Sequence, residues 1–142
     1  MASRQDSLSF LLADVSRLMR RAFRQRLEGS SLTLAQARAL IYVARHEGVR
    51  QVDLAEMLEL QPITLARLID QLADADLVER RADPADRRAY RMFLKPAAAA
   101  HLDAIRQVGA AIQADALRDL GADQAAITIQ ALNKMRENLC SR

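Results

Sequence analysis

Residues 53–94 read DLAEMLELQPITLARLIDQLADADLVERRADPADRRAYRMFL, and this stretch decides the fold. Apolar residues recur at helical spacing in two runs, which the short segment Glu59-Leu60-Gln61 separates. Leu77 and Val78 then start a strand, and the alternation from Tyr90 to Leu94 predicts the strand that returns. This order predicts a helix-turn-helix followed by a wing.

The second helix of this unit is expected to begin at Pro62, because the first turn of a helix does not need the N–H that proline lacks. Its inward positions are apolar: Leu65, Leu68, Ile69 and Leu72. Its outward positions are polar: Thr64, Arg67, Asp70 and Gln71. The DNA major groove admits such a helix, and an arginine there can bridge O6 and N7 of guanine. A solvated helix face is the alternative interpretation.

The hairpin that follows is strongly basic, with five arginines and two aspartates between Arg80 and Arg91. We expect the turn over residues 82–86 and a tip that carries Asp86-Arg87-Arg88. Such a tip can reach the minor groove or its phosphates beside a helix seated in the major groove. We expect Asp86 to hold an arginine through a bidentate ion pair, with a turn-starting role as the alternative.

Composition favours a single, mainly helical domain. The chain has 142 residues, 51% of them apolar, no tryptophan and few glycines or prolines. The net charge is +3, yet residues 50–95 hold eight basic against nine acidic residues. The prediction of a nucleic-acid partner therefore rests on where the charges lie and not on their total.

Other classes of protein have little support. His46 and His101 are the only histidines, and no catalytic or phosphate-loop motif occurs, so we expect no enzyme and no cofactor. No Cys/His cluster has metal-ligand spacing, so we expect no metal. Cys140 is the single cysteine, which excludes an intramolecular disulfide; we interpret it as an incidental thiol and not as a redox sensor. No leader-like or membrane-spanning apolar run is present, so a cytoplasmic location is expected.

Apolar positions on either side of the central unit predict further helices. The first runs from about residue 7 to residue 28, where Gly29 stops it. Thr33 and Gln36 have the spacing of a capping box, which predicts a second helix to about Glu47. Gln51 opens the next helix and is a candidate phosphate contact, with an ordinary helix-start role as the alternative. A basic side on the first helix also suits a membrane surface, but packing in the protein is favoured.

Two helices are expected after the wing. One extends from about Pro96 to Leu120, where Gly121 breaks it, and Asp123 is expected to cap the last helix. The central unit cannot cover three long apolar stripes, so we expect the terminal helices to form a homodimer interface. The predicted division is residues 1–32 as an N-terminal dimerisation helix, 33–95 as the winged helix-turn-helix, and 96–142 as C-terminal dimerisation helices.

Residues 60–94 resemble the DNA-binding core of the multiple antibiotic resistance regulator (MarR) family, and within it the SlyA-like branch. The resemblance is carried by Gln61-Pro62, the run RLIDQL over 67–72, LVER over 77–80, and Asp86-Arg87-Arg88. Asp76 stands where the family commonly has glycine, and aspartate tolerates a left-handed helix end better than most residues. After the wing, Lys95-Pro96 replaces the family's Thr-containing helix start.

The resemblance implies a homodimeric transcription factor, usually a repressor, that binds a pseudo-palindromic operator and responds to a small aromatic or phenolic ligand. Thr64 and Arg67 would face bases, and Arg87 and Arg88 would grip the minor groove or its phosphates. The weaker candidates for contact with the DNA backbone are Gln61, Gln71, Arg80 and Arg91. Arg17 is the candidate partner for a ligand carboxylate. The alternative function is a winged-helix adaptor that binds protein and has no DNA affinity.

Overall fold

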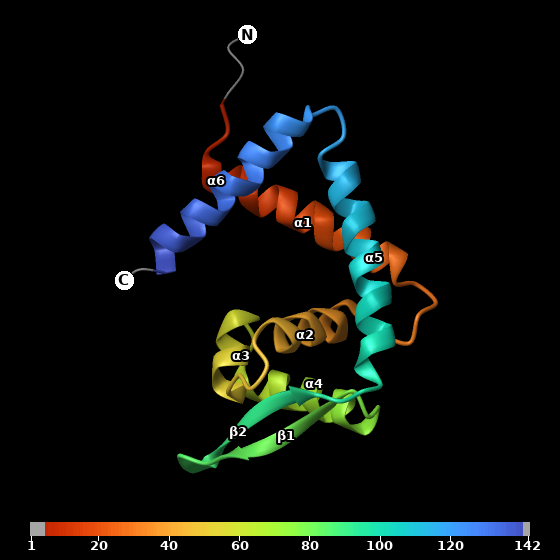
Figure 1. Ribbon diagram of the computed structural model, residues 1–142, viewed down its shortest axis with the longest axis vertical. Helices are drawn as coiled ribbons and strands as arrows, with labels where there is room; N and C mark the ends of the chain where they lie inside the picture. The colour runs from red at the N-terminus through yellow and green to blue at the C-terminus, as the bar shows by residue number, and fades with distance from the viewer. Residues whose placement is uncertain (1–4, 141–142) are drawn as a thin grey trace.

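A computed structural model describes residues 5–140 of the chain (Figure 1). The elements in order are α1 (Leu8–Arg26), α2 (Leu34–Arg45), α3 (Gln51–Met57), α4 (Pro62–Asp74), β1 (Val78–Asp83), β2 (Asp86–Leu94), α5 (Ala98–Ala116) and α6 (Ala122–Cys140). The two strands form one antiparallel sheet. The mainly helical fold with a small β wing is therefore confirmed. Within residues 5–140, no helix has both the length and the apolar content needed to cross a bilayer.

The helix-turn-helix has the predicted bounds and packing. Glu59 adopts a φ of 55°, which reverses the chain between α3 and α4, and the N–H of Leu60 donates to the carbonyl of Ala55. Pro62 is the first residue of α4. The four predicted inward residues of α4, Leu65, Leu68, Ile69 and Leu72, are all buried. Apolar spacing alone therefore identified the buried face of α4. The polar side chains lie on the opposite face, which points away from the core.

The wing is a longer hairpin than predicted. β1 continues through Ala82 and Asp83, and β2 begins at Asp86, so the connection is only Pro84-Ala85. The expected turn over residues 82–86 is thus corrected, because both flanking segments pair across the sheet. Asp76 has a φ of 63°, which confirms that it occupies the left-handed helix end, and it forms an ion pair with Lys95.

One core joins the winged unit to the start of α5. Its fully or nearly buried members come from α2, α3, α4, the sheet and α5: Ala37, Leu40, Val43, Leu54, Leu65, Ile69, Leu72, Met92, Leu102 and Ile105. The predicted capping box of α2 is present, with Thr33 and Gln36 exchanging side-chain-to-backbone hydrogen bonds. Because α5 contributes both to this core and to the opposite end of the molecule, it links the winged unit to α1 and α6 (Figure 1).

The C-terminal helices differ from the prediction at their ends. α5 stops at Ala116, before the expected Leu120, and the left-handed residue in the loop is Asp119 and not Gly121. Asp123 lies inside the first turn of α6 and does not cap it. The carboxamide oxygen of Gln124 instead accepts from the Gly121 N–H at 3.1 Å, which satisfies a donor at the helix start.

Candidate nucleic-acid interface

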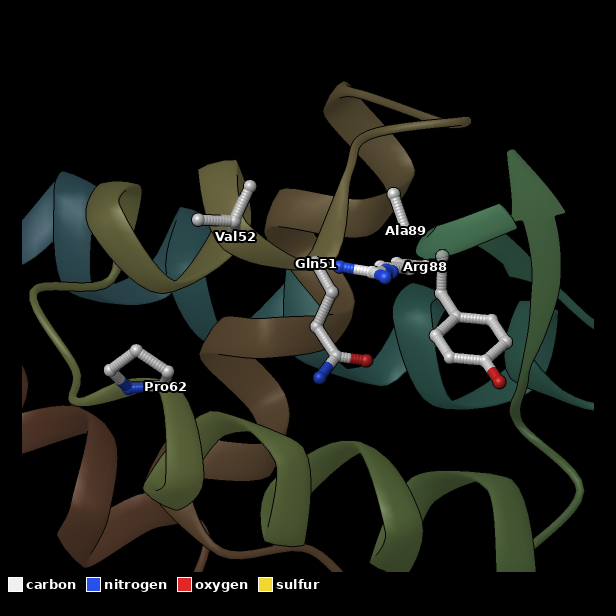
Figure 2. Close-up of a pocket in the computed structure, with 6 residues that line it drawn as sticks. Gln51, Val52, Pro62, Arg88 and Ala89 are labelled. Carbon is white, nitrogen blue, oxygen red and sulfur yellow. The ribbon is translucent and has the colours of Figure 1, made fainter. Parts of the chain in front are cut away.

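The starts of α3 and α4 and the outer part of the wing enclose a cleft of about 310 Å³. Figure 2 shows this cleft, with Gln51, Val52 and Pro62 from the helices and Arg88 and Ala89 from β2. Gln61, the residue before α4, makes no side-chain cap, so the first N–H groups of that helix are open to a ligand. An anion is the ligand that such a helix start favours.

Five of the predicted DNA-contacting residues project freely. Their side chains are exposed and make no hydrogen bond or ion pair within residues 5–140: Gln61, Thr64, Arg67, Arg87 and Arg88. Three of the five are arginines, whose guanidinium groups therefore remain available to acceptors on a partner. α4 presents one of them and the wing presents the other two.

Four other predicted contacts are occupied inside the protein. Each guanidinium nitrogen of Arg80 contacts a different acceptor. The acceptors are Oε1 of Gln51 at 3.0 Å, the carbonyl of Ala66 at 2.9 Å and Oδ1 of Asp70 at 2.6 Å. Gln51, expected to reach a phosphate, therefore accepts from Arg80. The carboxamide oxygen of Gln71 accepts from Gln36 at 3.1 Å.

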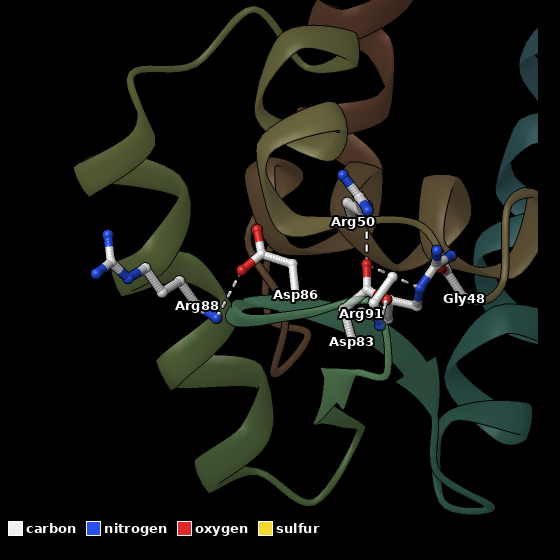
Figure 3. Close-up of polar contacts among 7 residues, drawn as sticks. Gly48, Arg50, Asp83, Asp86, Arg88 and Arg91 are labelled. Carbon is white, nitrogen blue, oxygen red and sulfur yellow. Dashed lines mark hydrogen bonds and ion pairs between the residues drawn. The ribbon is translucent and has the colours of Figure 1, made fainter.

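Arg91, the fourth, belongs to a cluster of half-buried arginines around the buried Asp83 carboxylate at the wing (Figure 3). Its Nη1 donates to the Gly48 carbonyl at 3.0 Å, and its Nε lies 3.3 Å from Oδ2 of Asp83. Nε of Arg50 lies 2.9 Å from the same oxygen. Neither N–H is directed well enough at Oδ2 for a hydrogen bond, so these contacts are ion pairs. Asp83 is 2% exposed, and its Oδ1 accepts from the Ala85 N–H at 3.0 Å.

The charge of Asp83 is favoured by its surroundings. The backbone hydrogen bond from Ala85 and then the positive charges of Arg91 and Arg50 hold the pKa of the Asp83 carboxyl below its ordinary value, against the opposing effect of burial. The ion pair predicted at Asp86 is corrected accordingly: Asp86 accepts from the backbone N–H of Arg88 at 3.0 Å, and Asp83 is the carboxylate that holds arginines. The position of Asp83 directly before Pro84 marked it only as a turn residue.

Arg17, which was predicted to bind a ligand carboxylate, also forms an ion pair inside the protein. It is paired with Asp14 at 2.6 Å and its side chain is 58% exposed. A largely apolar cavity of about 440 Å³ lies between α1, α2, α5 and α6, and its basic residues are Arg20 and Arg38. Tyr42 and Phe23 supply aromatic rings to its lining. The sequence pattern missed Arg38 and Tyr42, although their spacing of four placed them on one helix face.

No group of three or more His, Cys, Asp or Glu side chains suited to a metal ion occurs in the part of the chain that the structure describes. On the face formed by α4 and the wing, the exposed side chains without a partner within residues 5–140 supply guanidinium and amide donors. Such donors suit phosphate oxygens and the acceptor edges of bases.

Comparison with known proteins identifies the family. A sequence model of the MarR family matches residues 32–90. The crystal structure of the transcriptional regulator PA3341 is 33% identical, covers 96% of this chain and 100% of that chain, and superimposes with a TM-score of 0.79. The chain belongs to the MarR family. Proteins of the MarR family are transcriptional regulators and not enzymes.

Two further solved structures share the fold of this chain. A crystal structure of MarR superimposes with a TM-score of 0.86 at 24% identity, covering 99% of this chain and 95% of that chain. A mutant MarR from E. coli, complexed with operator DNA, superimposes with a TM-score of 0.72 at 26% identity, covering 90% of this chain and 92% of that chain. The winged helix-turn-helix of this MarR-family chain thus has a fold that a related protein uses on operator DNA.

Proposed function

We propose that this MarR-family chain is a homodimeric, sequence-specific DNA-binding regulator that represses transcription at pseudo-palindromic operators. The observation that carries this proposal concerns three exposed arginines of α4 and the wing: Arg67, Arg87 and Arg88 make no side-chain hydrogen bond or ion pair within residues 5–140. The donors of an internally paired arginine are already in use, whereas these three arginines present all their donors to solvent and to a DNA partner. We propose further that the chain belongs to the SlyA-like branch of the family, and the motifs over residues 60–94 support this proposal.

The free and the occupied residues have different roles in this proposal. Thr64 and Arg67 read base edges in the major groove. Arg87 and Arg88 hold the minor groove or its phosphates, and Gln61 meets a phosphate at the open start of α4. The remaining predicted contacts support the interface from within, because each makes at least one side-chain hydrogen bond inside the protein: Gln51, Gln71, Arg80 and Arg91.

The proposed dimer forms through the terminal helices. Neither α1 nor α6 contains a buried residue in the single chain. Large apolar side chains on both helices are exposed, including Leu8 (56%), Leu11 (48%), Ile127 (63%) and Leu139 (82%). A second copy would cover these residues and hold two α4 helices at half-sites about 34–36 Å apart. Residues 1–32 and 96–142 then form the dimerisation region, and residues 33–95 the DNA-binding domain.

The 440 Å³ cavity is the proposed site of a small aromatic acid. Its volume lies in the range of small-molecule sites, its lining is largely apolar, and Arg20 and Arg38 can donate hydrogen bonds to a carboxylate. The cavity separates the terminal helices from α2 of the winged unit. A ligand that fits one separation better than another would therefore change the spacing of the two wings and weaken DNA binding.

Selection of bound duplexes from a random pool, followed by binding titrations on the recovered sequence, tests the proposal. We expect a two-fold symmetric motif and an affinity that falls steeply as salt is raised, because phosphate contacts release counterions. Recovery of no motif, together with salt-independent or absent DNA binding, would favour a protein-binding adaptor instead.

A further inference from the structure

We propose that Arg80 is a positioning residue for sequence recognition, which acts by holding the Asp70 carboxylate away from Arg67. This inference rests on the proposed DNA-binding function. It explains how an acidic side chain is accommodated on the exposed face of α4, and it replaces the expectation that Arg80 contacts the DNA backbone.

The side chain of Arg80 reaches from β1 to both helices of the helix-turn-helix. Its Nη1 lies 2.6 Å from Oδ1 of Asp70, its Nη2 donates to the Ala66 carbonyl, and its Nε donates to Gln51. The Arg80 side chain is only 25% exposed. Three contacts to acceptors inside the protein, one from each guanidinium nitrogen, therefore fix the Arg80 side chain between β1, α3 and α4.

Asp70 has a second partner within reach. Arg67 precedes it by three residues on the same helix, and side chains at that spacing are neighbours on the helix surface. α6 contains a pair in the same order, in which Nζ of Lys134 lies 3.6 Å from a carboxylate oxygen of Glu137. In the structure Asp70 pairs with Arg80, and Arg67 makes no ion pair within residues 5–140. Arg80 thus occupies the Asp70 carboxylate, which would otherwise compete with a DNA base for the guanidinium of Arg67.

The same pairing neutralises Asp70 where DNA would dock. The Asp70 side chain is 60% exposed, on the outward face of α4. In water an exposed ion pair contributes little. When DNA excludes water from this face, an unpaired carboxylate would repel the phosphates and would attract Arg67 more strongly, because the local dielectric constant falls. The role of Arg80 should therefore appear in DNA binding more than in folding.

The test is a mutant cycle of Arg80→Met, Asp70→Ala and the double variant, measured on the selected operator and on a duplex altered at the base pair that Arg67 reads. We expect Arg80→Met to lose about tenfold or more in operator affinity and most of its discrimination between the duplexes. Asp70→Ala should bind as wild type or tighter, and the double variant should recover to within about threefold of wild type. Arg81→Met is the matched control, since Arg81 lies on the same strand with its guanidinium carbon 3.9 Å above the Phe93 ring.

Rescue by Asp70→Ala separates this role from the alternatives. If Arg80→Met binds like wild type, the inference is wrong. If the double variant stays as weak as Arg80→Met, the inference is also wrong, and Arg80 is structural or a phosphate contact. Loss of discrimination by Asp70→Ala alone would also overturn it, because Asp70 would then read the base itself. Circular dichroism checks folding, and Arg80→Gln serves in place of Arg80→Met should the latter be unfolded. If wild type binds no duplex, the proposed function itself fails.

Discussion

Nε of Arg50 lies 2.9 Å from Oδ2 of Asp83, which ties the residue before α3 to the turn of the wing. The same oxygen lies 3.3 Å from Nε of Arg91, whose Nη1 donates to the Gly48 carbonyl. A single buried carboxylate therefore joins both strands of the wing to the residue before α3 (Figure 3). We expect the charged form of Asp83 to hold the wing in its position over the helices.

Acidification should release this cluster. The folded-state pKa of Asp83 lies below its ordinary value of 3.8, so its stabilising contribution is fully present above that value and is lost as the pH falls through the folded-state pKa. At neutral pH, Asp83→Asn should lower the melting temperature by several degrees and weaken DNA binding. The difference in melting temperature from wild type should shrink as the pH falls below 3.8. Asp86→Asn, on an exposed carboxylate that makes no ion pair within residues 5–140, is the control and should leave the melting temperature at neutral pH nearly unchanged.

The buried face of α4 should account for most of what this helix contributes to the free energy of unfolding of the protein. Leu65 is fully buried, so Leu65→Ala should reduce the free energy of unfolding by about 2–5 kcal/mol through lost apolar burial and a cavity. Ile63 lies on the same helix and is 64% exposed, so Ile63→Ala should change it by less than about 0.5 kcal/mol. Urea unfolding at one fixed protein concentration measures both. Similar losses for the two variants would contradict the inward face assigned to α4.

Substitutions of the arginine on α4 and of an arginine on the wing should change DNA binding in different ways. Arg67→Ala should cost about 1–3 kcal/mol on the operator and relax discrimination at one base pair, because it removes a base contact. Arg88→Ala should weaken binding to matched and scrambled duplexes alike and reduce the salt slope by about one unit. Titrations on both duplexes across salt concentrations distinguish the two. Equal losses on both duplexes for Arg67→Ala would remove it from base reading.

Dimerisation should depend on the exposed apolar stripe of α1. Leu11→Glu places a charge in the proposed interface, and we expect the dimer to dissociate at micromolar concentration, because a charge buried without a partner is strongly unfavourable. Ala13→Glu is the matched control on a different side of α1, and it should leave the dimer intact. Sedimentation velocity reports both. A monomeric wild type at that concentration would contradict the proposed assembly.

Ligand binding should depend on the arginines that line the apolar cavity. Calorimetry with salicylate should show binding to wild type that Arg38→Ala weakens about tenfold, because a charge-assisted contact to the carboxylate is lost. Arg17→Ala should bind like wild type, since Arg17 pairs with Asp14 and lies outside the lining. A stronger effect of Arg17→Ala than of Arg38→Ala would return the site to the sequence-based prediction.

The sequence by itself determined the local features of this protein. Pro62 as the first residue of α4, the capping box of Thr33 and Gln36, and the left-handed Asp76 each depend on groups within a few residues. The apolar spacing of α4 identified its buried face for the same reason, since helical geometry is set locally.

Only the tertiary structure decided which polar residue meets which. Arg80 and Arg67 are both arginines near an acidic residue, yet Arg80 pairs with Asp70, whereas Arg67 makes no ion pair within residues 5–140. Asp83 and Asp86 both flank the turn of the wing, and Asp83 alone takes the arginines. The physical reason is that distance and burial determine which polar groups a long side chain can contact. Both are set by how the wing packs against α3 and α4, and spacing along the chain does not contain that packing.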